Sequence, residues 1–267
     1  MKKTQKNKQL KELWTKVLWI SALVGVAALV WFSVQTHLNS KINRIELNIE
    51  KLDGSRNLIS DPIALKHIES FFGKEIQEVR FTQLETKKLE AALKKDSRIE
   101  HAEVYVDGNN ILYVNIIQRA PIVRVMADNG EDYYLDKYGT RIKTVKKSAV
   151  RVPVASGHID EFVSDWKELN GHTLQDVLSI AKELPKDDFL QALIEQIYVE
   201  RDGSITLIPK MGKQELIIGS TEKLKVKLRN IKVTYKTIVR IKGFDKYKQF
   251  NFEITNQIRS VKPDQIS

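Results

Sequence analysis

Residues 17–34 read VLWISALVGVAALVWFSV, an apolar run that contains no charged side chain. As a helix, these 18 residues would reach roughly 27 Å at about 1.5 Å per residue, close to the ~30 Å hydrocarbon core of a bilayer. Trp14, Trp19 and Trp31 lie towards the two ends of the run, where amphipathic rings favour the membrane interface. The run therefore predicts one transmembrane helix over residues 17–34.

The charges that flank this run predict its orientation. Residues 1–16 hold six lysines and one glutamate, and lysine-rich flanks stay on the cytoplasmic side. We therefore expect a cytoplasmic tail over 1–16, with the rest of the chain outside the cytoplasm in a periplasmic position. A cleaved signal peptide is the main alternative, but its apolar core is shorter and ends at a small-x-small site, for which 33–35 and 38–40 are poor matches. A buried core helix would not explain the flanking lysines and tryptophans.

Composition limits what the rest of the chain does. The formal net charge is +10, and the head contributes five of these charges. The basic clusters at 143–147 and 223–232 are interrupted by apolar residues, which favours solvated faces, with a minor role near anionic membrane lipid, over a nucleic-acid site. The chain has no cysteine, so a fold outside the cytoplasm is held by its core alone.

The first part after the membrane run predicts a small α+β unit. Ile45, Leu47 and Ile49 alternate with polar residues, as in a half-buried strand, and a turn is expected at 53–54. Pro62 follows Asp61 where a helix would begin, and Gly73 would end it.

A second helix and a hairpin complete this unit. Residues 82–85, Thr-Gln-Leu-Glu, fit a capping box for a helix that reaches Lys95. Two strands over 99–106 and 111–117 flank the turn sequence Asp-Gly-Asn-Asn. The order strand, helix, helix, strand, strand predicts three strands with both helices on one face.

The second part predicts a mostly antiparallel β unit with flanking helices. The periodic segments are an amphipathic helix over 174–184, strands over 194–200, 205–208 and 215–218, a helix that starts at 219–221, and a closing strand over 250–258. In the second helix, one face carries Leu224, Leu228, Ile231 and Tyr235.

Several segments resemble the FtsQ/DivIB family of bacterial cell division proteins. Residues 97–106 and 111–121 resemble its hairpin, with Gln118-Arg119-Ala-Pro121 where the family has Glu-Arg-x-Pro. Residues 133–139 resemble the family's y-x-x-D-x-x-G, residues 152–157 its l-P-v-l-x-G, and Lys227-Leu228 its K-L pair. The resemblance implies a POTRA domain over 41–125, a β domain over 126–259 and a C-terminal tail over 260–267.

The resemblance also implies a function. Members of this family are non-enzymatic scaffolds of the septal division machinery, whose last strand region receives FtsB (DivIC in Gram-positive bacteria), which travels with FtsL. Because a terminal strand is often a sheet edge, a partner strand could add there. The corresponding partner-binding residues here are Phe250, Asn251, Phe252, Glu253, Ile254 and Thr255. A core role for Phe250, Phe252 and Ile254 is the alternative.

Enzymatic alternatives find little support in the residues. The five histidines lack HxxxH or HExxH spacing, and the glycines form no phosphate loop, so we expect no metal and no cofactor. An anchored Ser–Lys peptidase would share the topology, but Ser40-Lys41 and Ser55 lie in polar surroundings. Asp136 is explained by a turn that ends at Gly139. A POTRA-bearing secretion or outer-membrane assembly component would need further POTRA repeats or a barrel.

Overall fold

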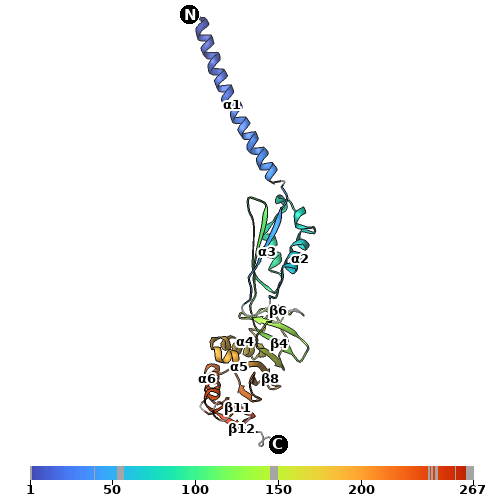
Figure 1. Ribbon diagram of the computed structural model, residues 1–267, viewed down its shortest axis with the longest axis vertical. Coiled ribbons are helices and arrows are strands. Elements are labelled where there is room, and N and C mark those ends of the chain that lie inside the picture. Colours follow the sequence, from blue (N-terminus) through green and yellow to red (C-terminus); the bar gives the residue numbers. More distant parts are fainter. Residues whose placement is uncertain are drawn as a thin grey trace. The chain divides into compact units, whose positions relative to one another are not determined.

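The computed structural model describes residues 2–38, 40–52, 57–144, 150–239, 241, 243, 246–255 and 257–262 (Figure 1). The turn predicted at 53–54 and Ser55 lie outside these residues. The chain divides into two compact units. The N-terminal unit comprises residues 1–48, 61–93 and 102–116, and the C-terminal unit comprises 49–60, 94–101 and 117–267.

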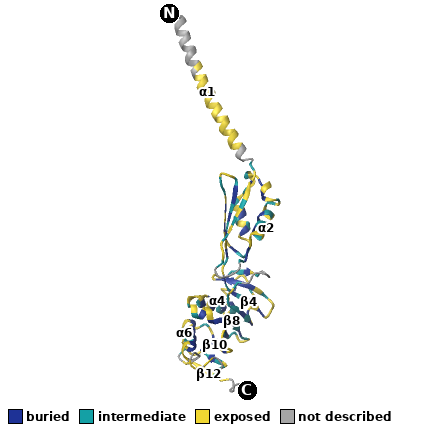
Figure 2. Ribbon diagram, viewed as in Figure 1, coloured by how far each residue is buried: buried dark blue, intermediate teal, exposed yellow. Residues whose placement is uncertain are grey.

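The first helix, α1 (Lys2–Leu38), contains the predicted membrane run. Its segment Lys16–Gln35 is long and apolar enough to cross a membrane, and none of that segment is buried in the protein (Figure 2). It is the one such helix among the described residues. Uncovered apolar side chains along such a segment need an apolar solvent, which supports a single-pass membrane protein.

A three-stranded sheet follows, in the predicted element order. It contains β1 (Arg44–Ile49), β2 (Ile99–Val106) and β3 (Ile111–Gln118) in the spatial order β1-β3-β2. At the hairpin turn between β2 and β3, Asp107 Oδ1 accepts hydrogen bonds from the amides of Asn109 (2.9 Å) and Ile111 (2.8 Å). The predicted hairpin is therefore confirmed, together with the role of its turn sequence.

Two helices join β1 to β2, α2 (Asp61–Phe72) and α3 (Thr86–Leu93). The predicted ends of α2 are confirmed, since Gly73 follows it with a φ of 69°. The predicted capping box at 82–85 is wrong. Residues Phe81–Gln83 form the short helix η2, which follows η1 (Ile76–Glu78), and the Glu85 carbonyl accepts the first amide bonds of α3.

The second sheet has nine strands in the order β12-β11-β10-β9-β8-β7-β4-β5-β6. Its strands are β4 (Pro121–Ala127), β5 (Asp132–Asp136), β6 (Arg141–Lys143), β7 (Val154–Gly157), β8 (Ile194–Val199), β9 (Ile205–Pro209), β10 (Glu215–Gly219), β11 (Gln249–Asn251) and β12 (Arg259–Val261). Five neighbouring pairs are antiparallel and three are parallel. The division that we expected between residues 125 and 126 falls inside β4, which pairs with β5 and β7.

Parallel neighbours need a crossover, and helices provide it for two of the three parallel pairs, while β5 and β6 lie between β4 and β7 in the sequence. The connection from β7 to β8 contains α4 (Thr173–Glu183), η3 (Leu184–Lys186) and α5 (Asp188–Leu193). The connection from β10 to β11 contains α6 (Leu224–Thr234), which continues into η4 (Tyr235–Val239). The three α-helices contact the sheet at β4, β8 and β10, respectively.

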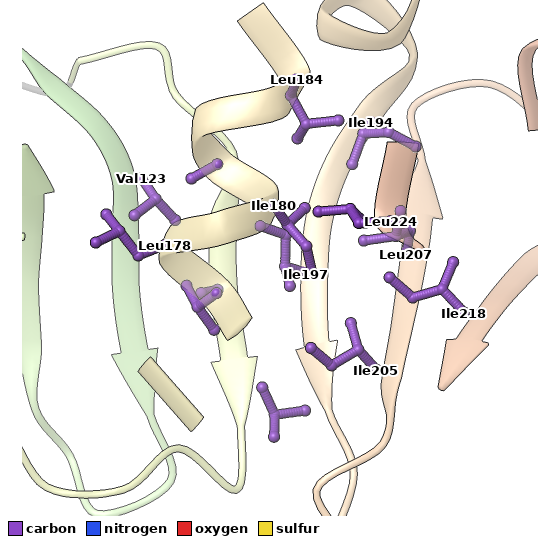
Figure 3. Close-up of a cluster of buried hydrophobic side chains, with 14 of the residues drawn as sticks. Val123, Leu178, Ile180, Leu184, Ile194, Ile197, Ile205, Leu207, Ile218 and Leu224 are labelled. Atoms are coloured by element: carbon purple, nitrogen blue, oxygen red, sulfur yellow. The ribbon is translucent and has the colours of Figure 1, made fainter. Parts of the chain in front are cut away.

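One hydrophobic core joins these helices to the sheet. In Figure 3, Ile180 of α4 and Leu184 of η3 lie among Ile194, Ile197 and Leu207 of the strands beneath. The predicted apolar faces of α4 and α6 both belong to this core. The sheet therefore holds its helices through burial of their apolar faces, as expected for an unbridged fold without cysteine.

Candidate partner-binding edge

The residues that we predicted to bind a partner lie at the C-terminal end of the nine-stranded sheet. Here β10 pairs in parallel with β11, and β11 pairs antiparallel with β12. The centre of this register places Phe250 opposite Leu216 on one side and Ser260 on the other.

The strand predicted over 250–258 is wrong in length. Strand β11 covers only Gln249–Asn251, and among the described residues no strand follows until β12. The cause lies in two hydrogen bonds between neighbouring side chains and backbone. The Glu253 amide donates to Asn251 Oδ1 (2.9 Å), and Asn251 Nδ2 donates to Glu253 Oε2 (2.8 Å). This local bonding competes with the ladder and turns the chain.

The apolar residues of the predicted site divide between core and surface. Phe250 and Phe252 are fully buried, with ring centroids 6.3 Å apart, and the Phe252 amide still donates to the Ile217 carbonyl (2.8 Å). Ile254, which the alternating pattern placed with them, is 53% exposed. The core role is thus correct for the two phenylalanines and wrong for Ile254.

The segment after β11 is fixed by contacts with its surroundings. Asn230 of α6 donates its side-chain amide to the Thr255 carbonyl (2.8 Å). Gly219, at the end of β10, has a φ of 62°, and a Cβ there would lie 2.9 Å from Glu253 Cγ. Glycine is therefore required at 219 for both its backbone conformation and the close approach of Glu253.

The free edge that we expected on β11 is also wrong, because β12 covers it. Residues 259–261, part of which we assigned to a tail, form this outer strand. Arg259 and Ser260 are exposed, and Val261 is half-buried. The Val261 carbonyl accepts the Lys248 amide (2.9 Å) and so faces β11. Because successive residues of an edge strand alternate in direction, the backbone groups of Ser260 face the open side.

A buried lysine that our site prediction omitted stabilises the start of this region. Lys227 is 3% exposed, and its Nζ donates to the carbonyls of Ile218 (2.8 Å) and Ser220 (2.9 Å). Burial lowers the pKa of the Lys227 ammonium, and the nearby Glu222 and Glu253 partly oppose this effect. The signal in the sequence was a lysine on the apolar face of α6, beside Leu224, Leu228 and Ile231.

The carboxylate that looked most like a catalytic group has a structural role. Asp136 Oδ1 accepts the amides of Tyr138 (2.8 Å) and Thr140 (2.7 Å), and its Oδ2 accepts from Arg119 (2.8 Å). Arg119 also donates to the carbonyls of Ser97 (3.1 Å) and Ile99 (3.2 Å). Within the described part of the chain, no cluster of His, Asp or Glu residues could hold a metal ion.

The comparisons with known proteins identify the family. The family model described as "FtsQ/DivIB, C-terminal related" matches residues 120–260, which is just over half of the chain. The chain belongs to the FtsQ/DivIB family. The match begins just before β4 and ends in β12, so it covers the nine-stranded sheet except Val261. No curated protein matches the chain in a sequence comparison.

Family membership gives the chain a role in bacterial cell division. Members of the FtsQ/DivIB family are non-catalytic division proteins. This agrees with the structural role of Asp136. The uncovered apolar segment of α1 is consistent with a single-pass membrane protein of this family.

Proposed function

We propose that this chain is a non-enzymatic scaffold of the bacterial division septum, which recruits FtsB/DivIC-like and FtsL-like partners. In this proposal α1 crosses the cytoplasmic membrane once, with its N-terminus in the cytoplasm and both compact units on the periplasmic side. The three-stranded sheet with α2 and α3 would be the POTRA domain. The lysine excess before the span supports this orientation.

The observation that carries the proposal is the exposed three-residue strand β12 at the end of the family-matched sheet. A partner strand could pair with the open side of β12 through main-chain bonds, while exposed side chains supply specificity. The exposed Ile254 and Ile258 lie in the segment that leads into β12 and give the partner apolar contacts. This moves the docking strand from the predicted β11 to β12. Residues 250–252 then serve as its support.

Proline at position 260 tests this docking mode. Ser260→Pro removes an amide that faces the open side, and proline is tolerated at such positions of an edge strand. We expect the variant to fold normally and to bind an FtsB/DivIC-like partner at least tenfold more weakly, a loss of about 1.4 kcal/mol. The measurement is partner binding by the full chain in nanodiscs, with thermal unfolding as the check on folding.

The matched control is Ser260→Ala, which keeps the amide and removes only the exposed hydroxyl. It should bind as the unmodified chain does. If Ser260→Pro folds and binds with unchanged affinity, the partner does not pair with β12, and strand addition at this edge is wrong.

A further inference from the structure

An open groove of about 480 Å³ lies between the C-terminal part of α4 with η3 and the start of α6. Four lysines line it, Lys182, Lys186, Lys223 and Lys225, against the single acid Glu183. All of these residues belong to the C-terminal unit. We refer to this feature as the lysine groove.

The positive charge continues along α6 beyond the groove. Residues 223–244 contain eight lysines and arginines and no aspartate or glutamate. Lys225, Arg229 and Lys232 follow at intervals of four and three residues, which places them on one face of α6, and Lys236 follows four residues later in η4. From the sequence we expected a solvated face here, and the proposed partner-binding edge does not include these residues.

Only part of this charge is neutralised within the protein. Lys186 pairs with Glu183 (2.6 Å), and Lys232 pairs with Asp187. Lys223 lies 4.0 Å from the exposed Glu222. Lys182, Lys225 and Arg229 make no ion pair within the part of the chain that the structure describes. Like charges that are held together without acids favour binding of an external anion.

The chemistry of the groove distinguishes between classes of anion. Lysine is depleted at the cores of protein–protein interfaces, whereas it binds phosphate well as a flexible point charge. The apolar floor, Leu224 and Val226, offers no deep pocket for a protein side chain, since Leu224 is only 8% exposed. None of the described residues that line the groove is aromatic, so these residues offer no stacking surface of the kind that single-stranded nucleic acids use.

We propose that the lysine groove binds a linear polyol-phosphate polymer of the cell envelope, with consecutive phosphodiesters contacted by Lys182, Lys223 and Lys225. The groove lies between two helical segments, so it admits a single extended chain more readily than the flat surface of a bilayer. The location of this polymer outside the cytoplasm rests on the orientation proposed above. The binding of phosphate groups by the groove lysines does not depend on that orientation.

The test uses the full chain in nanodiscs of zwitterionic lipid and a fluorescent glycerol-phosphate oligomer, with binding followed by anisotropy. Lys182→Gln/Lys225→Gln removes two groove lysines that make no ion pair in the described structure. We expect about fivefold weaker binding for each lysine, or about 25-fold for the double variant. Binding should also weaken as salt concentration rises, because phosphate contacts release counterions.

The matched control is Lys66→Gln/Lys87→Gln, which removes two exposed lysines of α2 and α3 and changes the net charge equally. It should lower affinity less than twofold. Equal losses in both double variants, or no loss in the groove variant, would overturn the assignment.

Competitors of matched charge test the class of ligand. The proposal is wrong if polyglutamate, a single-stranded oligonucleotide or phosphatidylglycerol vesicles bind the groove as tightly as the glycerol-phosphate oligomer. It is also wrong if inorganic phosphate binds as tightly as the oligomer. Ser260→Pro should bind the oligomer normally, so failure of this inference and failure of the partner proposal give different results.

Discussion

Replacement of Asp136 by asparagine tests whether the most conspicuous buried carboxylate of the C-terminal unit is structural. In Asp136→Asn, one side-chain oxygen can still accept the amides of Tyr138 and Thr140. The new amide NH₂ would instead face Arg119 Nη1, so that two donors meet where the native distance is 2.8 Å. The Arg119 side chain, which is 17% exposed, then remains charged but has lost the carboxylate of Asp136 as its partner.

The magnitude follows from that geometry. Breaking a buried ion pair by removal of one partner costs about 3–5 kcal/mol. Arg119 retains its two carbonyl bonds, to Ser97 and Ile99, which places the expected loss at the low end, about 3 kcal/mol. A unit of this size loses about 2–4 °C of melting temperature per kcal/mol, so Tm should fall by roughly 6–12 °C.

Calorimetry of the full chain, with the double variant Arg119→Met/Asp136→Asn, completes the test. Because the two groups interact directly, the double variant should be more stable than the sum of single losses predicts, by at least about 1.5 kcal/mol. The exposed Asp128, replaced by asparagine, is the control and should change stability by less than about 0.5 kcal/mol. Additive losses for Arg119 and Asp136, or a loss below about 1 kcal/mol for Asp136→Asn, would refute the argument.

Three further outcomes are expected. Burial raises the pKa of Tyr133 and Tyr235, so above about pH 10 the folded chain keeps phenol protons that the unfolded chain loses. The free energy of unfolding should therefore fall as the pH rises above about 10, by up to about 1.4 kcal/mol per pH unit for each tyrosine. An unfolding free energy from denaturant titration that stays constant between pH 9 and about 11 would contradict this. Phe250→Ala should cost about 3–5 kcal/mol of unfolding free energy, because the ring is fully buried, and a loss below about 1 kcal/mol in chemical denaturation would show that the ring is not a core residue. Val24→Lys/Leu29→Asp should release the chain from membranes, since each charge at the centre of a span costs about 3 kcal/mol, and unchanged membrane fractionation would argue against the span.

The features that sequence predicted well depend on local physical rules. The membrane run, the ends of α2 and the β2–β3 hairpin each follow from residues close in the chain. The turn at Asp136 belongs to the same class, because its side chain bonds amides only two and four residues away. Gly139 adds a φ of 75°, as the pattern required. Such features need no knowledge of distant partners.

The errors concern pairing between distant segments. The alternation of Phe250, Phe252 and Ile254 predicted one long strand, because periodicity does not register the bonds between Asn251 and Glu253 that end it. Strand β12 is only three residues long and carries no alternating apolar pattern, so nothing in the sequence separated it from a tail. The position of β4 in the larger sheet likewise depends on its pairing with β7, about thirty residues further along the chain.

The replacement of the family glutamate by Gln118 has a physical explanation that only the structure supplies. The Gln118 side chain accepts the Ile59 amide (2.9 Å) and donates to the Glu50 carbonyl (2.7 Å). A carboxylate can accept but cannot donate, so glutamate would lose the second bond. The position of residue 118 at the end of a strand gave no reason to expect glutamine there.

The late position of β12 in the sequence has a consequence during synthesis of the chain. Arg259–Val261 follow all the other strands of this sheet in the sequence. The ribosome therefore synthesises this outer strand after the strands that it covers. A chain that lacks Arg259–Val261 would keep the buried Phe250 and Phe252 and would expose the edge of β11 that β12 covers. Under the docking mode proposed above, such a chain would lack the strand that receives the partner, so partner binding would require synthesis of residues 259–261.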